Sequence, residues 1–461
     1  MERMSALDAG FWDMEDEHAA LHIGAVAVFE GPAPSASEIA ALYARRVQEC
    51  PRYRQRMRRA RLRLRRPAWV DDPAFDLAYH LRRTALPAPG EKPELDRLVG
   101  RLMSTHLDEH RPLWEAWVIE GLDGDRWALL VKLHHSMVDG IGGMTLFTTL
   151  LDMPGRESNS RPPSEEPART GALSPVAAIA ARLGFIRTIV RDVEEVARNP
   201  VGTARTGVAG LRSARSLART LRPTVATSLN GRLGTPRRYR TVSVEIEEIT
   251  RVREALGGTV NDVALAMIAR GFRELLTARG ERCTEHTVRS MVPVSVRGSA
   301  ERNEVANHVA VLLVDLPVSV PDPFDAYRAL ITSTRSAKAS GAASAGRTGF
   351  SIADHLPAPV AAGFFSALGK FPQRIVTTVT TNVPGPPATA YLLGRRMLAL
   401  YPYVPIAAHV RVGIAITSYD GLVHFGITCD RDSVPDADVL TAGMTTGLGE
   451  LTKLAMENEP H

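Results

Sequence analysis

The sequence predicts an α/β protein made of two units that are joined by a linker. Apolar runs of strand length alternate with segments of helical spacing in residues 1–153 and again in residues 230–461. Residues 154–170 between them are rich in Ser, Pro, Glu and Arg, a composition typical of linkers. A chain of 461 residues fits roughly two to three domains. We therefore expect domains at 1–153 and 230–461 and a linker with amphipathic helices at 154–229.

The first unit begins with a strand and a well-marked helix. The apolar run from Leu21 to Phe29 predicts a strand. Ser35 and Glu38 have the spacing of a capping box, and apolar residues follow them at helical spacing. The other elements expected in this unit are a helix at 98–110, a buried strand at 127–133 and a helix from Gly142-Gly143 through Leu151.

The second unit carries two strong local signals. Thr259 and the Asn261-Asp262 pair predict the start of a long helix over 263–276. Asp420-Gly421 is a turn dipeptide between two apolar runs, which predicts a hairpin of strands 411–419 and 422–429. The other elements expected here are strands at 241–246, 288–296, 308–316 and 374–383 and a last helix at 436–456.

The composition is that of a globular protein and limits its partners. Hydrophobic residues make up 44% of the chain and charged residues 23%, with a net charge of +5. This charge suits anionic partners such as phosphorylated cofactors or an anionic membrane, but it is too small to indicate nucleic acid. Cys50, Cys283 and Cys429 are far apart and predict no disulfide framework, so a reducing cytosol is the simplest compartment. No apolar stretch reaches the roughly 18 residues of a membrane span.

The most informative motif is His134-His135-Ser136-Met137-Val138-Asp139-Gly140, directly after the predicted strand 127–133. Imidazole has an unperturbed pKa near neutrality, so it can accept and return a proton. Because neighbouring side chains on a strand point to opposite faces, we expect His135 to face the site as a base and His134 to brace it from behind. Asp139 lies at the Asp-Gly turn and is expected to pair with a cation. Two packed core histidines, or a metal site, are the alternatives. No third ligand cluster is apparent, so we expect no metal.

The sequence lacks the signatures of other chemistries. It contains no G-x-S-x-G elbow, P-loop, G-x-G-x-x-G or H-E-x-x-H motif. A base without a nucleophilic motif indicates that the substrate brings its own nucleophile. A hydroxyl that attacks an activated acyl group fits this pattern.

The histidine motif resembles the HHxxxDG signature of the coenzyme A-dependent acyltransferase superfamily, which includes nonribosomal peptide condensation domains. Other motifs resemble, in the same order, those of the bacterial wax ester synthase/diacylglycerol acyltransferase family, particularly actinobacterial triacylglycerol synthases. The resemblance covers residues from about 4 to about 455. The matching motifs are Leu7-Asp8-Ala9-Gly10-Phe11, Arg111-Pro112-Leu113-Trp114-Glu115, Asn261-Asp262-Val263, Val292-Pro293-Val294-Ser295-Val296-Arg297 and Thr381-Asn382-Val383-Pro384-Gly385-Pro386.

The resemblance implies two chloramphenicol acetyltransferase-like α/β domains, a helical linker and a channel at the domain interface. It implies that His135 deprotonates a long-chain alcohol or a diacylglycerol, which then attacks a long-chain acyl-CoA. Acyl-CoA would be a co-substrate, with no permanently bound cofactor. The remaining residues it assigns are His134, Asp139 and Gly140 in the catalytic motif, Arg297 paired with Asp139, and Pro112, Leu113, Trp114, Asn261 and Asp262 near the substrate.

These assigned residues also have simpler interpretations. Trp114 can be a core residue, and Asn261-Asp262 can be only a helix cap. The turn after Thr381 can be only a rigid turn.

Two segments bear on lipid surfaces. Residues 52–66 hold nine arginines and no acidic residue, and several alternate as they would on a strand with one charged face. This run is either a solvated edge strand or an attraction site for phosphate groups of a cofactor or an anionic bilayer. Residues 174–222 contain an apolar stripe, either a packed helix or an interfacial membrane helix. We expect a cytoplasmic protein, peripherally associated with the inner membrane face or lipid droplets.

Two other functions remain open at this point. A condensation-type acyltransferase would keep the histidine motif but take its acyl group from a carrier protein. A non-catalytic lipid-binding protein of a membrane or lipid-droplet surface would use the arginine run and the 174–222 helices alone.

Overall fold

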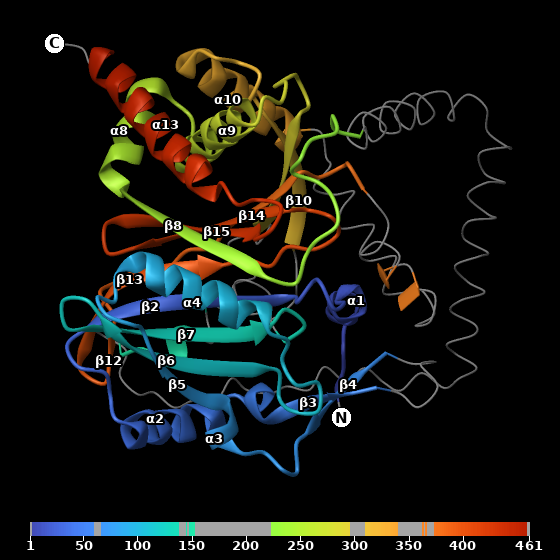
Figure 1. Cartoon of the computed structure of the whole chain (residues 1–461), viewed down its shortest axis with the longest axis vertical. Helices are drawn as coiled ribbons and strands as arrows, with labels where there is room; N and C mark the ends of the chain where they lie inside the picture. Colours follow the sequence, from blue (N-terminus) through green and yellow to red (C-terminus); the bar gives the residue numbers. More distant parts are fainter. Residues whose placement is uncertain are drawn as a thin grey trace, which may run out of the picture. The chain divides into compact units, whose positions relative to one another are not determined.

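Mixed β-sheets with helices packed against them carry the α/β fold that the sequence predicts (Figure 1). The computed structural model describes residues 2–59, 66–137, 144, 147–152, 223–295, 309–339, 362–363, 365–366 and 373–458. These sheets belong to one compact unit, Met1–Arg156 with Pro223–His461. The linker helices predicted within 174–222 lie outside the described residues.

The first large sheet has the strand order β12-β13-β2-β7-β6-β5. Its neighbouring strands are antiparallel except for β5 and β6, which are parallel. Helices α1, α2, α3 and α4 lie between or before strands of this sheet along the chain. The bounds are β2 (His22–Glu30), β5 (Leu81–Ala85), β6 (Trp114–Leu122), β7 (Arg126–His134), β12 (Tyr391–Leu392), β13 (Arg395–Tyr403), α1 (Ala6–Met14), α2 (Ala36–Glu49), α3 (Leu77–His80) and α4 (Lys92–Ser104).

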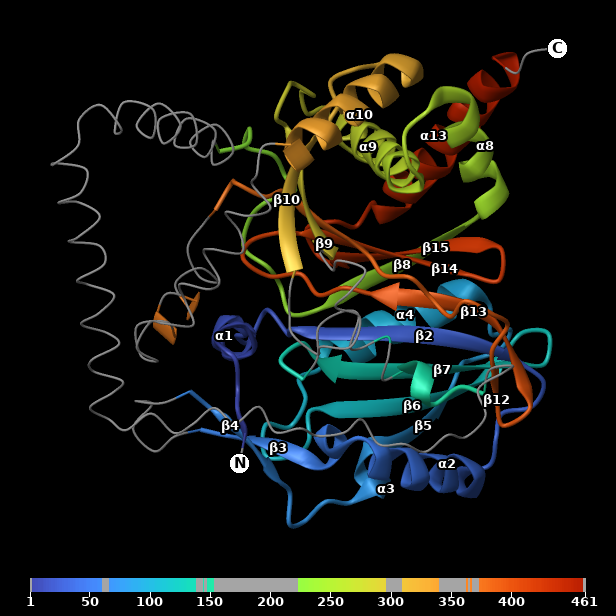
Figure 2. The same ribbon diagram turned by 180° about the vertical axis from the view of Figure 1, so that it is seen from behind.

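The second large sheet has the strand order β10-β9-β11-β14-β15-β8. The pairs β9/β11 and β11/β14 are parallel, and the others are antiparallel. Helices α8, α9, α10 and α13 cover one face of this sheet, as Figures 1 and 2 show. The bounds are β8 (Arg237–Glu245), β9 (Val288–Ser295), β10 (Val309–Leu316), β11 (Thr378–Asn382), β14 (Val412–Tyr419), β15 (Leu422–Asp430), α8 (Ile246–Leu256), α9 (Val260–Ala278), α10 (Pro323–Ala339) and α13 (Ala437–Glu457).

A small sheet lies near the N-terminus. It consists of β1 (Glu2–Arg3), β4 (Ala68–Asp71) and β3 (Gln55–Arg58), in that order. Here the arginine run proves to be only partly a strand: Pro51–Arg54 form a 3₁₀ turn before β3 begins. Residues 60–65 of the run lie outside the described residues.

Strands from the C-terminal part of the chain complete the first sheet. β13 pairs with β2, from Met397 opposite Phe29 to Tyr403 opposite Gly24. The segment therefore joins the sheet of the predicted N-terminal domain, although it lies in the range 230–461. The sequence did not predict this pairing of β13 with β2, because the two strands lie at opposite ends of the chain. The remaining division into domains stays a prediction.

The strongest local signals are confirmed. Ser35 and Glu38 form a reciprocal capping box, with Ser35 Oγ accepting from the Glu38 backbone N–H at 3.2 Å. The turn between β14 and β15 has left-handed backbone at Asp420 and Gly421, with φ of 47° and 80°. This is the conformation that a two-residue hairpin of this type requires.

The helix predicted at 98–110 is wrong at both ends, since α4 spans Lys92–Ser104. Pro93 lies in the first turn, a position where proline costs no hydrogen bond. At the other end, Lys132 of β7 donates to the carbonyl oxygens of Leu102, at 3.0 Å, and Thr105. An ammonium group that takes the last carbonyls favours termination there. The end of α4 is thus set by a contact from strand β7, outside the helix.

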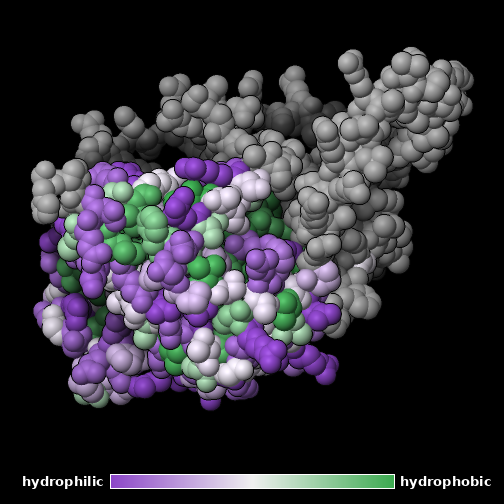
Figure 3. Space-filling view, turned by 90° about the horizontal axis from the view of Figure 1, so that it is seen from above, coloured by the Kyte–Doolittle hydropathy of each residue, from purple (hydrophilic) through white to green (hydrophobic). Residues whose placement is uncertain are grey.

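The described surface is largely hydrophilic, with apolar residues scattered in small groups on the face seen in Figure 3. Among the described residues, the exposed large apolar side chains are Val225 (44% exposed) and Met456 (55% exposed). Within the same residues, no helix has the length and apolar character needed to cross a bilayer.

Candidate active site

The two histidines of the motif lie at the carboxyl end of β7 and contact residues of α1. Figure 1 labels both elements. Strand β7 is buried along most of its length, and His134 lies opposite His22 of β2 in the register. The His134 side chain is 1% exposed, whereas His135 is only partly buried. The two rings therefore have different environments, as the alternation of a strand predicts.

Hydrogen bonds hold the buried ring of His134 on both sides. The backbone N–H of Ser136 donates to His134 Nδ1 at 3.0 Å, and Ser136 Oγ lies 2.7 Å from the same atom. The Glu15 carboxylate bonds to Nε2. Since Nδ1 accepts a backbone N–H, the neutral ring carries its proton on Nε2 and donates it to Glu15.

The partly exposed ring of His135 stacks on an aromatic residue of α1. The centroids of the Phe11 and His135 rings are 3.9 Å apart, with 20° between the planes. The backbone N–H of His135 donates to the carbonyl oxygen of Leu21 at 2.9 Å. The backbone of His135 is thus anchored to β2's N-terminal side while its ring packs under α1.

A polar cluster surrounds Glu15, which is 12% exposed at the end of α1. Its Oε1 lies 3.4 Å from His106 Nε2 and 3.8 Å from His22 Nε2. Burial lowers the pKa of His22 well below its usual value, so this ring is neutral near pH 7. Burial also lowers the pKa of Lys132 to about 8, while Glu115 and Glu15 act to raise it. Sequence reasoning identified none of these residues as part of the site.

One of the missed residues left a visible signal in the sequence. Lys132 stands alone between apolar neighbours in the run 127–133, and a lysine in a buried strand needs a partner. His22 begins the strand that pairs with β7, which could be recognised only once that pairing was known. Nothing in the local sequence singles out Glu15, because its partners come from other elements.

A backbone hydrogen bond connects the Pro112-Leu113-Trp114 motif to the histidine motif. The backbone N–H of His134 donates to the carbonyl oxygen of Leu113 at 3.0 Å. Trp114 is fully buried, and its Nε1–H donates to the carbonyl oxygen of Tyr53 at 2.8 Å. Its ring stacks on His80 with a centroid separation of 4.4 Å. This packing is that of a core residue, and the predicted contact of Trp114 with substrate has no support in it.

The structure brings Asn261 to a second family motif. Asn382, at the end of β11, donates from Nδ2 to Asn261 Oδ1 at 3.4 Å. Asp262, in contrast, is 3% exposed and completes the capping box of α9, accepting from the backbone N–H of the N-cap residue Thr259 at 2.9 Å. Thr334 of α10 donates to the other carboxylate oxygen of Asp262 at 2.8 Å. Of this pair, Asn261 is therefore the one available near the turn after β11.

Other predicted residues cannot be placed. Asp139, Gly140 and Arg297 lie outside the described residues, and so do residues 142, 143, 145 and 146 of the helix predicted from Gly142-Gly143 through Leu151. Their roles stay predictions. Within the described part of the chain, no group of three or more His, Cys, Asp and Glu side chains is arranged to hold a metal ion.

Three arginines of the run 52–66 have acidic partners: Arg52, Arg56 and Arg59. Arg52 pairs with Glu2 at 3.0 Å, and Arg59 pairs with Glu109 at the same distance. The Arg59 guanidinium also lies 5.4 Å from the centre of the Trp12 ring, which in turn packs against His134. These pairs partly neutralise the charge that the sequence suggested for binding phosphate groups.

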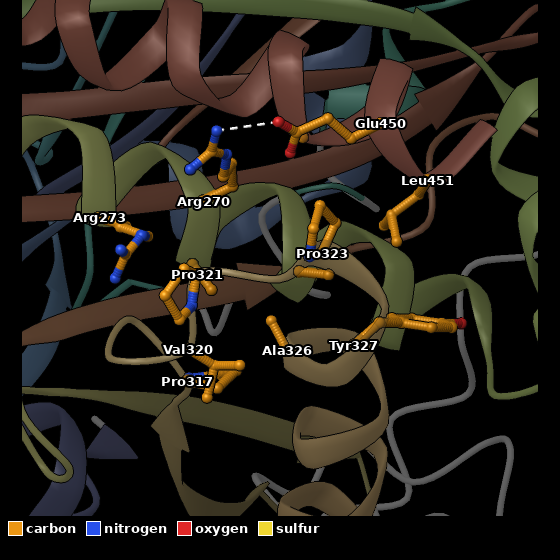
Figure 4. A pocket seen from close by; sticks show the side chains of 13 residues that line it. Arg270, Arg273, Pro317, Val320, Pro321, Pro323, Ala326, Tyr327, Glu450 and Leu451 are labelled. Atoms are coloured by element: carbon orange, nitrogen blue, oxygen red, sulfur yellow. Dashed lines mark hydrogen bonds and ion pairs between the residues drawn. The ribbon is translucent and has the colours of Figure 1, made fainter. Parts of the chain in front are cut away.

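A small pocket occurs away from the histidines, between α9, α10 and α13 (Figure 4). Its wall includes Pro321, Pro323 and Tyr327, with Arg270 and Glu450 joined by a hydrogen bond of 2.9 Å. Since Arg270 also pairs with Glu274 at 2.8 Å, its charge is already balanced. The pocket contains none of the predicted site residues.

Two family models match the chain. The wax ester synthase/diacylglycerol acyltransferase catalytic domain matches residues 4–264, and the WS/DGAT C-terminal domain matches residues 305–452.

Relatives of similar length exist in mycobacteria. The chain is 38% identical over 465 residues to the probable diacylglycerol O-acyltransferase tgs1 of Mycobacterium tuberculosis, with 99% of this chain and 96% of that protein covered. The identity and coverage are the same for the putative diacylglycerol O-acyltransferase Mb3154c of Mycobacterium bovis.

Solved structures share the fold. The wax ester synthase/diacylglycerol acyltransferase from Marinobacter aquaeolei VT8 matches with a TM-score of 0.67 at 25% identity, covering 98% of this chain and 100% of that one. The starter condensation domain of rhizomide synthetase RzmA, solved in complex with C8-CoA, matches with a TM-score of 0.56 at 14% identity, covering 99% and 95%. The architecture is thus the two-domain, chloramphenicol acetyltransferase-like fold that the sequence predicted. Both the family models and the full-length relatives show that the chain belongs to the wax ester synthase/diacylglycerol acyltransferase family.

Proposed function

We propose that the chain is an acyl-CoA-dependent O-acyltransferase that esterifies diacylglycerol, a long-chain alcohol or both, with His135 as the general base. One observation carries the assignment of the base: His134 is buried and bonded on both ring nitrogens, while His135 keeps part of its surface exposed at the end of a rigid strand. The names of the mycobacterial relatives support diacylglycerol as an acceptor. The RzmA domain holds C8-CoA in the same fold, which supports a free acyl-CoA donor.

The proposed reaction transfers one acyl group and moves one proton in a cycle. His135 removes the proton from the acceptor hydroxyl, and the oxygen attacks the thioester carbonyl carbon. The tetrahedral intermediate collapses, the carbon–sulfur bond breaks, and the CoA thiolate leaves. The imidazolium of His135 returns the proton to that thiolate, so the products are an ester and CoA-SH. No cofactor stays bound in this scheme.

The other motif residues have supporting roles in this proposal. Asp139, Gly140 and Arg297 keep the structural roles that the family resemblance assigns, with Asp139 paired to Arg297. Asn261 belongs near the channel, supported by its contact with Asn382. Leu113 and Trp114 act by holding strand β6 against the histidine strand, since both are fully buried.

The test is a CoA-release assay with purified protein and palmitoyl-CoA. We expect release only when an alcohol or a diacylglycerol is added, and we expect His135→Ala to reduce turnover by roughly a hundredfold or more. His110→Ala is the matched control, because His110 is an exposed histidine of the same sheet's connecting loop. Unchanged turnover in His135→Ala would contradict the mechanism.

An acceptor panel identifies the substrate class within this function. Hexadecanol, dipalmitoylglycerol and a monoacylglycerol are compared with one acyl-CoA donor. Preferential use of dipalmitoylglycerol would identify a triacylglycerol synthase, and preferential use of hexadecanol a wax ester synthase.

A condensation-type enzyme with a carrier-bound donor is the second candidate, and the fold shared with condensation domains favours it. Turnover with free palmitoyl-CoA excludes a strict need for a carrier protein. Turnover only with an acyl group tethered to a carrier would replace the first proposal by this one.

A peripheral location in the cytoplasm, on the inner membrane face or on lipid droplets, is part of the proposal because both substrates are lipids. Removing the charges of arginines 58, 59, 61 and 63 should weaken binding to anionic vesicles and reduce its dependence on salt. Vesicle binding without acyl transfer to any acceptor would instead indicate a non-catalytic lipid-binding protein.

A further inference from the structure

Helix α1 contacts both histidines of the motif from one side. Phe11 stacks on His135 with a centroid separation of 3.9 Å. Glu15, at the C-cap of the same helix, bonds through its carboxylate to His134 Nε2. Residues four apart on a helix lie on the same face, one turn from each other. The two contacts therefore depend on one placement of α1.

We propose that Glu15 is a positioning residue for His135: its carboxylate holds α1 against the end of β7 and fixes the ring of His134. This inference rests on the proposed function, since it assigns Glu15 to the support of the proposed base. Glu15 itself has no role in proton transfer here. It acts through Phe11 on one side and through His134 on the other.

The ring of His134 is part of the turn that carries His135. Its Nδ1 accepts from the Ser136 backbone N–H at 3.0 Å, and its carbonyl oxygen accepts from the Met137 N–H at 2.9 Å. Both hydrogen bonds are accepted by His134, so the backbone of the turn depends on the position of this residue. Glu15 accepts a hydrogen bond from Nε2–H and, together with the Ser136 N–H, favours the tautomer in which Nδ1 accepts. With Glu15 removed, the other tautomer would point an N–H at the N–H of Ser136.

The same carboxylate supplies negative charge to a site of basic groups. The groups that face it are His22 of β2, His106 after α4, and Lys132 and His134 of β7. Glu115 is the other acid near this group, with Oε2 at 4.0 Å from Lys132 Nζ. Replacing Glu15 by a neutral residue takes this negative charge away from the basic groups around it.

The experiment compares Glu15→Ala and Glu15→Gln with wild type, each as the full chain. For Glu15→Ala we expect kcat to fall by roughly thirtyfold or more, with KM for palmitoyl-CoA changed by less than about threefold. Glutamine can still accept from Nε2–H, so Glu15→Gln should recover most of the loss in kcat. Glu17→Ala, at an exposed acid two residues away, is the control.

A second measurement does not need turnover. In ¹⁵N-histidine spectra of wild type, His134 should show an unprotonated Nδ1 and a protonated Nε2, and Glu15→Ala should mix the tautomers. Modification of His135 by diethyl pyrocarbonate should be faster in Glu15→Ala and in Phe11→Leu than in Glu17→Ala. Circular dichroism identifies a variant that has not folded, in which case Glu15→Gln and Phe11→Leu decide.

The outcomes separate the two proposals. A wild type without acyl transfer would reject the proposed function. The tautomer and modification data would still test whether Glu15 holds α1 and the His134 ring in place. An active wild type with unchanged kcat and His134 tautomer in Glu15→Ala would overturn the inference about Glu15 alone.

Discussion

Gly426 of β15 lies directly against the carbonyl oxygen of Pro402 in β13. A Cβ at position 426 would be 1.7 Å from that oxygen. The same carbonyl accepts a hydrogen bond from Tyr239 Oη of β8 at 2.7 Å. The strand that completes the first sheet is thus fastened to the second sheet at this point, and only glycine permits the approach.

Replacing Gly426 by alanine should destabilise the protein by roughly 3 kcal/mol or more, because β13 must move away from β15. Denaturation in urea measures the change. Gly449→Ala is the control: that glycine is exposed within α13 with no atom near its missing Cβ, so alanine should be neutral or stabilise by about 0.5–1 kcal/mol. Equal stability of the two variants would contradict the close approach.

Substitution of Trp114 separates a core role from a binding role. Trp114→Phe loses the hydrogen bond to Tyr53 and some packing, so we expect a loss of roughly 1–2 kcal/mol in stability with kcat/KM within about threefold of wild type. Trp114→Ala should cost about 3–5 kcal/mol. An unchanged stability of Trp114→Phe together with a raised KM for acyl-CoA would support the substrate contact predicted from the sequence.

Asn261 and Asp262 should give different phenotypes although they are adjacent. Asp262→Ala removes the N3 half of the capping box of α9 and the bond from Thr334, so its stability should fall by about 2 kcal/mol. Asn261→Ala should change stability by less than about 0.5 kcal/mol but lower kcat/KM, because Asn261 lies partly exposed beside Asn382. Thermal unfolding and steady-state kinetics measure the two effects. The reverse pattern would reject the assignment of Asn261 to the channel.

Asp96 of α4 should make stability depend on pH. Burial raises its pKa from 3.8 to about 6, although Lys92 lies 3.9 Å away. The folded state binds the Asp96 proton more tightly than the unfolded state does. The stability that the protonated carboxyl contributes is therefore fully present below pH 3.8 and is lost as pH rises through about 6. The loss amounts to about 3 kcal/mol for a shift of this size.

Asp96→Asn removes the ionisation, so the difference in unfolding free energy between wild type and variant should change between pH 4 and pH 7 in favour of the variant. Urea denaturation across this range checks it. A pH-independent difference would show that Asp96 ionises with an ordinary pKa in the folded protein.

Several elements could be predicted because the residues that form them are neighbours in the chain. The capping box of Ser35 and Glu38 and the Asp420-Gly421 turn satisfy their own backbone groups within four residues. The apolar run 127–133 indicated a buried strand, and β7 contains all of it. The histidine motif and its accompanying motifs were sufficient to identify the family.

Elements that depend on distant partners were wrong or missed. The end of α4 is set by Lys132, so helical spacing up to His110 was misleading. β13 was not predicted because its arginines, tyrosines and proline have no clear alternation, and its pairing with β2 gives it strand form. Trp114 belongs to a family motif, yet its surroundings are those of the core.

The sequence by itself determined the α/β class, the family and the position of the two histidines at a strand end, because periodicity, caps and motifs are properties of short segments. Only the tertiary structure decided that Glu15 and Phe11 of one helix hold the pair and that β13 crosses to the first sheet. The physical reason is that burial and hydrogen-bond partners come from segments far apart in the chain, whose meeting no local pattern encodes.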